Sequence, residues 1–491
     1  MSSGLSWNTI ALGVSTVTTL ALTPVLVHHL GSDRYGIVAL VITLALTLSN
    51  FDGGIGAATT RFVAVHLGAD EHDRVTRLVV SVTLALLGLG LVIAVALFAA
   101  AHALAGAFDI PHGLRDDAAT VIRVVAPLTT AGLLRGAFGA VLAAEARWRA
   151  LAQVTIVSQA VYVGLVLFAV HTGGGVLFVV LALLGQQVTA AVLLLALSLR
   201  TVRRGRAGLL TLPQGREFLR YAGAAQLINI TNLVNTEFDA VVIAAILPVR
   251  YVGFYSVGAG LAGVIRVIPI NAAGPLQTVL ARAFGGGGVA AAHAELGRLQ
   301  RFWVRAVLPL MLIAAPTALY GIPVWVGHSF REAGVVAAVL LVGYGINLLG
   351  TPTAVYAASV GRPGLESRYG VVTVVLNVVL TVPLGIAFGL IGVVIATSAS
   401  QIIGVFYLRV ITARALVPRP TSFFDDLPVG PTLVAAGAAA GVTYLLGRVL
   451  PLGVGGFLVC GLVAGLLFLA TTAVTLPEAR RGALVRLRRP A

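Results

Sequence analysis

The sequence predicts an all-α integral membrane protein with about 14 transmembrane helices. Of its 491 residues, 58% are hydrophobic and only 10% are charged, whereas soluble globular proteins average about 25% charged residues. So little charge cannot cover a surface that faces water, and the bilayer must therefore be the solvent for most of the chain. Since one crossing needs about 20 apolar residues, this number of helices leaves room for short loops only.

Apolar runs bounded by charged residues, Pro or Gly locate the crossings. They cover residues 8–28, 36–58, 78–101, 118–141, 150–170, 176–198, 221–247, 254–281, 303–326, 333–357, 368–388, 390–411, 428–449 and 453–475. The tight junction at 388–390 predicts a helical hairpin. The chain carries no basic residue before the first apolar run, so we interpret 8–28 as an uncleaved first helix rather than a signal peptide.

The arginines predict the orientation. All 33 basic residues are arginine, and with a cytoplasmic N-terminus 26 of them lie in cytoplasmic loops and the C-terminal tail, against 5 on the opposite side. The positive-inside rule describes this bias, so we expect both termini in the cytoplasm. The net charge of +15 is then spread along the cytoplasmic rim, where it meets anionic headgroups. Membrane lipid is therefore an expected partner, and nucleic acid is not.

A weak internal repeat predicts two related halves. The turn LGSDRYG at 30–36 is similar to LPVRYVG at 247–253, and Gly175 and Gly392 are separated by the same offset of 217 residues. We expect an N-terminal six-helix bundle, a basic interlobe linker, a C-terminal six-helix bundle, an accessory helix pair and a basic cytoplasmic tail. These segments cover 1–198, 199–220, 221–415, 428–475 and 476–491. Such parallel halves can enclose a site that opens alternately to either face.

Several motifs carry a family resemblance. They are LGSDRYG (30–36), DGGIGAATTR (52–61), DAVVI (239–243), VGFY (252–255) and the hairpin PLG…GLIG (383–392). Over residues 1–415 the chain resembles the Wzx-type, O-antigen-flippase branch of the multidrug/oligosaccharidyl-lipid/polysaccharide exporter superfamily. The resemblance implies two helical bundles around a cavity in the bacterial inner membrane. It also implies export of an undecaprenyl-pyrophosphate-linked oligosaccharide, with a polysaccharide polymerase and glycosyltransferases as further partners.

Other functions stay open. The last two helices are similar to those of lipid II flippases, but those carry arginines in the first helix, and 8–28 contains none. A multidrug or small-molecule antiporter of the same superfamily is a second alternative. A membrane-embedded glycosyltransferase or polymerase would need a sizeable loop with clustered acids or a base, which the longest loops lack. We therefore expect no enzyme, no cofactor and no metal site.

Arg266 is the strongest candidate for substrate binding. Ionisable residues at membrane depth cost about 2.5–3.5 kcal/mol each on insertion scales, and they usually face a cavity or a partner. Arg266 lies ~18 Å along its apolar span, near the middle of the bilayer. A guanidinium binds phosphate through a planar fork and stays charged when desolvated. We therefore expect Arg266 to contact the pyrophosphate, with a structural ion pair to Asp239, Glu237 or Asp52 as the alternative.

Span 221–247 carries an unusual set of polar residues. At 100° per residue, Asn232, Asn235 and Asp239 fall on one face, and Asn229 continues the polar arc. We expect this face to line a hydrated cavity, with interhelical hydrogen bonds as the alternative.

The remaining ionisable residues suggest coupling and access. Asp239, Glu237 and Asp52 are candidates for coupling or gating, because a desolvated carboxyl can exchange a proton near neutral pH; the coupling ion is either H⁺ or Na⁺. Arg135 is placed to meet an entering headgroup. Arg123 lies near the end of its span, where it either contacts the pyrophosphate or extends to the interface.

Overall fold

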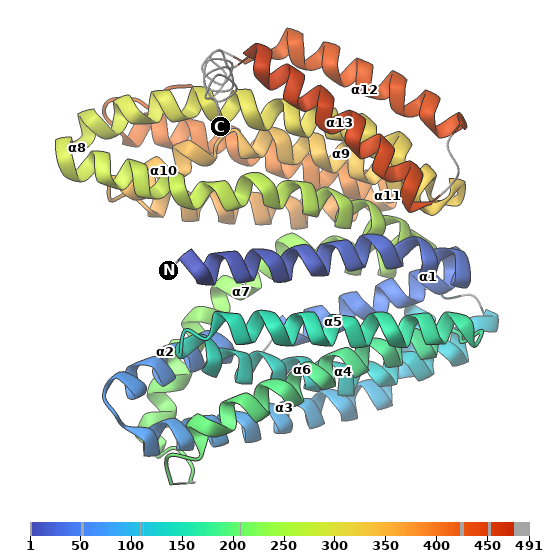
Figure 1. Cartoon of the computed structure of the whole chain (residues 1–491), viewed down its shortest axis with the longest axis vertical. Helices are drawn as coiled ribbons and strands as arrows, with labels where there is room; N and C mark the ends of the chain where they lie inside the picture. Colours follow the sequence, from blue (N-terminus) through green and yellow to red (C-terminus); the bar gives the residue numbers. More distant parts are fainter. Residues whose placement is uncertain are drawn as a thin grey trace, which may run out of the picture. The chain divides into compact units, whose positions relative to one another are not determined.

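The structure is a computed structural model that describes residues 2–50, 54–108, 110, 112–206, 208–422, 427–449 and 453–475. Within these ranges every regular element is a helix (Figure 1). The helices are α1 (Ser2–Asn50), α2 (Ile55–Gly68), α3 (His72–Ala107), η1 (His112–Leu114), α4 (Arg115–Ala144), α5 (Trp148–His171), α6 (Val176–Val202), α7 (Leu212–Ile246), α8 (Arg250–Val326), η2 (His328–Phe330), α9 (Arg331–Leu348), α10 (Thr351–Ser359), α11 (Gly364–Ala415), α12 (Val429–Val449) and α13 (Val454–Thr475).

The first compact unit covers Met1–Gly253. Its centre is α4, which packs against α1, α2, α3, α5 and α6. Buried residues recur at spacings of three or four, as with Leu78, Val82 and Leu86 on α3 and Ala137 and Val141 on α4. This spacing places them on one face of each helix, and the two faces form a shared apolar core.

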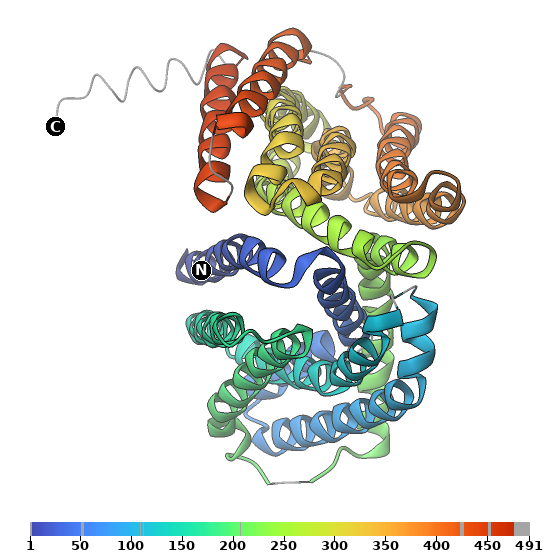
Figure 2. The ribbon, with the colours of Figure 1, turned by 90° about the vertical axis from the view of Figure 1, so that its right-hand side faces the viewer.

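The second compact unit covers Phe254–Ala491. Here α11 packs against α9 and α10, and α12 pairs with α13, the two red helices of Figure 2. The pair is attached to α8 through a small apolar cluster in which Ile313 meets Ala435 and Ala439. The rest of α13 is largely exposed, with Leu462 64% and Leu469 63% accessible. Such apolar surface is expected where lipid, and not water, is the neighbour.

The predicted fold class is confirmed. Eleven helical segments of the described residues are long and apolar enough to cross a membrane. Six of them have 30 residues or more, which is longer than one crossing needs. Three helices contain residues with non-helical backbone angles: Gly31 in α1, Gly287 and Gly288 in α8, and Gly389 in α11. Helices α8 and α11 each hold two of the predicted spans, and α1 holds the first span and most of the second. The hairpin expected at 388–390 is present: Gly389 breaks α11 with φ 63°, and Asn377 and Thr397 on either side of it form a hydrogen bond.

Some boundaries differ from the prediction. The predicted span 36–58 is not one helix, since α1 ends at Asn50 and α2 begins at Ile55 after Gly54, whose φ is 73°. The segment between the predicted spans 254–281 and 303–326 is helical except at Gly287 and Gly288. The alanine-rich residues beside these glycines favour a helix.

The interlobe segment is also more helical than expected. Helix α6 continues to Val202, and α7 begins at Leu212, where Thr211 and Gln214 form a capping box. In this box each side chain satisfies a free backbone N–H of the first turn. Helix α7 packs against α1 and α2 in the first unit, and the division into two six-helix bundles remains a prediction.

The two turns related by the internal repeat contact each other. A Cβ on Gly36 would lie 2.4 Å from the carbonyl oxygen of Val249, and one on Gly253 would lie 3.3 Å from the Cα of Gly36. Only a residue without a side chain permits this approach. The glycines that end the motifs at 30–36 and 247–253 therefore have a packing role at the point where the repeated turns meet.

Candidate functional site

Arg266 lies in the first part of α8, inside the apolar segment Arg250–Asn271. Its guanidinium carbon is 4.2 Å from the centroid of the Tyr344 ring on α9. The Nε atom is buried and has no hydrogen-bond partner among the described residues. A cation over an aromatic face is stabilised by the ring quadrupole without losing its charge. The guanidinium is therefore held in place while it still has donors to offer.

A polar network continues from Tyr344 along α9. Asn347, one turn further on, donates a hydrogen bond to the hydroxyl of Tyr369 and a second one, of 3.1 Å, to the backbone oxygen of Gln401. Both hydrogen-bond partners of Asn347 belong to α11, so the network ties α9 to both segments of that helix.

The network ends at a break between α9 and α10. The carbonyl oxygen of Leu348 accepts a 2.7 Å hydrogen bond from the indole of Trp303, and that of Leu349 accepts a 2.9 Å bond from the amide of Gln300. Trp303 and Gln300 are both buried on α8. The carbonyl groups at the end of a helix have no partner within it, and here side chains of another helix provide one.

Buried polar side chains also join the two segments of α11. Asn377 donates a 3.1 Å hydrogen bond to the hydroxyl of Thr397, and Thr381 donates one of 3.4 Å to the amide oxygen of Asn377. Asn377 and Thr397 lie on either side of Gly389, so the bond between them joins the two arms of the hairpin, and Thr381 contacts the Asn377 amide from the same arm.

The first unit holds a second polar group, on α4, α5 and α6. Arg135 donates a 3.2 Å hydrogen bond to Gln187, and the adjacent Gln186 donates one to Gln159. Gln159 is buried, whereas Arg135 is exposed. The structure thus places Arg135 beside a pair of amides that the sequence interpretation had not singled out.

Arg123 of α4 contacts a histidine of the neighbouring helix α3. Its Nη2 lies 3.3 Å from Nδ1 of His102 on α3, and its Nε is buried without a hydrogen-bond partner among the described residues. His102 in turn lies 3.9 Å from Asp116 at the start of α4. These contacts join the ends of α3 and α4, and the role expected of Arg123 at the pyrophosphate stays a prediction.

The acids and amides expected along α7 are described only in part. Asp239 is buried, with 3% of its surface exposed. The side chains of Glu237, Asn229, Asn232 and Asn235 lie outside the described residues, as does Asp52. The cavity-lining and coupling roles expected of them stay predictions.

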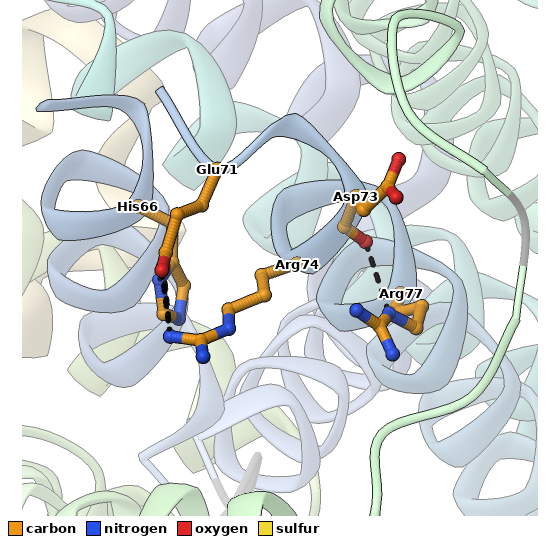
Figure 3. A network of polar contacts seen from close by, with 5 residues as sticks. All are labelled: His66, Glu71, Asp73, Arg74 and Arg77. Atoms are coloured by element: carbon orange, nitrogen blue, oxygen red, sulfur yellow. Dashed lines mark hydrogen bonds and ion pairs between the residues drawn. The ribbon is translucent and has the colours of Figure 1, made fainter. Parts of the chain in front are cut away.

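A charged cluster surrounds the turn between α2 and α3 (Figure 3). The ring nitrogen Nδ1 of His66 lies 2.7 Å from Glu71, whose other oxygen is 2.9 Å from Arg74. The hydrogen bond from His66, followed by the charge of Arg74, holds the pKa of Glu71 below its ordinary value of 4.5 despite some desolvation. Asp73 accepts a 2.7 Å hydrogen bond from the backbone of Arg206, which fastens the segment between α6 and α7 to this turn.

The sequence analysis named Arg266 and Arg135 as candidates but did not name the residues that contact them. Gln186 and Gln187 form an adjacent amide pair in an apolar span, and this signal was available in the sequence. Tyr344 gave none, because single aromatic residues are ordinary in membrane helices. Among the described residues, no group of three His, Cys, Asp or Glu side chains is arranged to hold a metal ion.

Comparisons with known proteins agree on the fold. The lipid II flippase MurJ, in an inward closed conformation, aligns with a TM-score of 0.70 and 13% identity, covering 96% of this chain and 99% of its own. An inward-facing multidrug resistance MATE family transporter of the MOP superfamily aligns with a TM-score of 0.65 and 15% identity, covering 81% and 92%. A MOP superfamily transporter from Pyrococcus furiosus gives 0.55 and 16%, covering 82% and 93%. At such identities the likeness concerns the fold.

The sequence itself shows the family. No curated protein matches the chain. A family profile described as "Polysaccharide biosynthesis protein" matches residues 3–279, more than half of the 491 residues. The chain therefore belongs to the polysaccharide biosynthesis protein family and has the membrane-transporter fold seen in MurJ and the MATE transporters.

Proposed function

We propose that the protein is a flippase that moves a polyprenyl-pyrophosphate-linked oligosaccharide from the cytoplasmic to the outer leaflet for surface polysaccharide biosynthesis. The observation that carries the proposal is Arg266, a guanidinium within an apolar segment that is held by the Tyr344 ring and has a buried Nε without a hydrogen-bond partner among the described residues. A pyrophosphate must cross low dielectric during transport, and a charged planar fork stabilises it there. Membership of the polysaccharide biosynthesis family supports this class of substrate.

The mechanism we propose is alternating access. The headgroup enters from the cytoplasmic side while the lipid tail stays in the bilayer, and rearrangement of two helical bundles exposes it to the outside. Arg123, Arg135 and the amides of α7 (Asn229, Asn232 and Asn235) would line the path. Asp239, Glu237 and Asp52 would couple or gate the cycle with H⁺ or Na⁺. The protein would lie in the bacterial inner membrane with both termini in the cytoplasm, beside a polymerase and glycosyltransferases, and would catalyse no reaction itself.

A complementation assay tests the role of Arg266. Cells that lack the gene are given wild-type protein, Arg266→Ala or Arg266→Lys, and surface polysaccharide is measured at matched protein levels. We expect Arg266→Ala to abolish the polysaccharide and Arg266→Lys to restore part of it, since lysine keeps the charge but loses the fork.

Arg448 provides a matched control. It is an exposed arginine on α12 whose guanidinium also stacks on a tyrosine, with Cζ 4.7 Å from the ring centroid of Tyr444. Arg448→Ala should leave the polysaccharide unchanged. Normal polysaccharide with Arg266→Ala would remove Arg266 from the mechanism.

The genes next to this one give an independent test. Neighbouring glycosyltransferase and polymerase genes would support the flippase, and a gene for a drug-responsive regulator would contradict it.

A further inference from the structure

We propose that the first unit contains a subsite for a sugar of the headgroup, formed at Arg135; this inference rests on the proposed function. The site is a cavity of about 260 Å³ bounded by α4, α5 and α6. Its lining includes Arg135 and Gly136 of α4, Thr155 of α5 and Leu194 of α6.

Glycines of α4 make the room. Gly132, Gly136 and Gly139 recur at spacings of four and three, which places them on one face of the helix, and all three line the cavity. A Cβ built on Gly136 would have no atom within 4 Å. The missing side chain at this position therefore opens space to a ligand and is not needed for close packing of another helix.

Polar groups at and next to the cavity offer both donors and an acceptor. Arg135 and Thr155 line the cavity, and Gln187 lies outside the lining and is bonded to Arg135. The Oε1 atom of Gln187 accepts a hydrogen bond from Arg135, so the amide N–H groups and the other guanidinium N–H groups are the donors that the pair can offer a ligand. The hydroxyl of Thr155 donates its proton to the carbonyl oxygen of Leu151 at 3.0 Å, so its oxygen can only accept. A sugar hydroxyl donates and accepts at once, whereas a fully ionised phosphate only accepts. The set therefore fits a sugar better than a phosphate.

The neighbouring contacts fix the amide. Gln186, the residue before Gln187, donates to Gln159, which is 6% exposed on α5. This bond joins α5 to α6 beside the cavity and restricts how the Gln187 backbone can move. A binding site needs such support, because a loosely held polar group pays more entropy on contact.

The cavity lies where a headgroup that enters from the cytoplasmic side would arrive early. Thr155 lies seven residues after the start of α5, Arg135 nine before the end of α4 and Leu194 eight before the end of α6. At 1.5 Å per residue, these distances are about 10–14 Å from the helix ends that the arginine distribution assigns to the cytoplasm. A headgroup loaded from the cytoplasmic leaflet would reach this depth early.

A binding experiment with two lipids tests the subsite. Purified full-length protein in nanodiscs is titrated with undecaprenyl pyrophosphate and, separately, with the lipid-linked saccharides extracted from the cells that make this protein. We expect the wild type to bind the saccharide lipid about tenfold more tightly than the bare lipid, since a few sugar hydrogen bonds can contribute that much. Gly136→Leu, which fills the cavity, and Gln187→Leu, which removes the amide, should abolish this difference and leave the affinity for the bare lipid within about twofold.

The controls separate this proposal from the previous one. Gly164→Leu adds the same side chain at a glycine of α5 that also has open space around it and lies outside the cavity lining; its selectivity should equal that of the wild type. Arg266→Gln should weaken the binding of both lipids by the same factor. Gly136→Ala replaces the leucine variant if that variant does not fold, and it should reduce in part the selectivity, which is the ratio of the affinities for the saccharide lipid and the bare lipid.

Two outcomes would overturn the subsite only: equal affinity of the wild type for the two lipids, or an unchanged ratio in Gln187→Leu and the Gly136 variants. Failure of the wild type to bind either lipid contradicts the proposed function itself.

Discussion

The guanidinium of Arg266 and the ring of Tyr344 form a stacked pair, with the Arg266 Cζ 4.2 Å from the ring centroid. Tyr344 is 8% exposed, so the pair is largely desolvated on the tyrosine side. A cation–π contact is worth about 0.5–2 kcal/mol, with the larger values in desolvated sites. The ring also limits the directions in which the guanidinium can point, and this determines where its N–H donors are presented.

The first prediction concerns this ring. Tyr344→Phe keeps the aromatic face and should retain transport, whereas Tyr344→Leu removes it and should lower the transport rate of a reconstituted protein by about 2- to 30-fold. The measurement is translocation of a fluorescent lipid-linked saccharide in proteoliposomes. Tyr444→Leu breaks the corresponding exposed pair on α12 and should have no effect. Equal rates for Tyr344→Leu and the wild type would show that the ring does not position Arg266.

The second prediction concerns the break between α9 and α10. Trp303→Phe removes the indole N–H that serves the carbonyl oxygen of Leu348. An unsatisfied buried acceptor costs about 1–3 kcal/mol, so the melting temperature in detergent should fall. Phe302→Leu, at the adjacent position that is 55% exposed, is the control and should leave the melting temperature nearly unchanged. A drop no larger than that of the control would mean that water or another group serves Leu348.

The third prediction concerns the contact between the repeated turns. In Gly36→Ala the added Cβ would lie 2.4 Å from the carbonyl oxygen of Val249, which is backbone and cannot rotate away. Forced overpacking costs about 1–3 kcal/mol, so thermal stability in detergent should decrease. Gly13→Ala, in the same helix but with no atom within 4 Å of the new Cβ, should leave it equal or slightly raised. Two variants with equal melting temperatures would contradict the close approach.

The fourth prediction concerns pH. The hydrogen bond from His66 lowers the pKa of Glu71 below 4.5 in the folded state, so the ionised carboxylate favours folding. This contribution is present above the ordinary pKa and is lost as the pH falls through the lower, folded-state pKa. Glu71→Gln should therefore melt below the wild type at pH 7, and the gap should narrow towards pH 3.

A double-mutant cycle identifies the partner in that experiment. If His66 is the main cause, the effect of Glu71→Gln at pH 7 should be smaller in a His66→Gln background than in the wild type. An unchanged gap across the pH range, or the same effect of Glu71→Gln in both backgrounds, would contradict the assignment.

The sequence predicted the membrane class, the hairpin at Gly389 and the division of α1, because apolar length and glycine at a junction are local signals. It placed one span over 36–58, because its glycines are compatible either with close packing of a continuous helix or with a local break, and composition alone does not decide between the two. The same limit applies to the site. Arg266 and Arg135 stand out because charge is rare in an apolar helix, whereas Tyr344 joins Arg266 from 78 positions away and only the packing of α8 against α9 reveals it.

The hydrogen bonds from Gln300 and Trp303 to the end of α9 have a mechanical consequence. An intact helix in hydrocarbon resists bending, because each opened backbone bond exposes a polar group that nothing nearby can satisfy. At Leu348 and Leu349, side chains of α8 already serve the carbonyl oxygens in place of backbone N–H groups. The segment formed by α9 and α10 can therefore bend here without exposing further polar groups. We expect bending within the second unit to occur mainly between α9 and α10, with Gln300 and Trp303 determining the angle between these two helices.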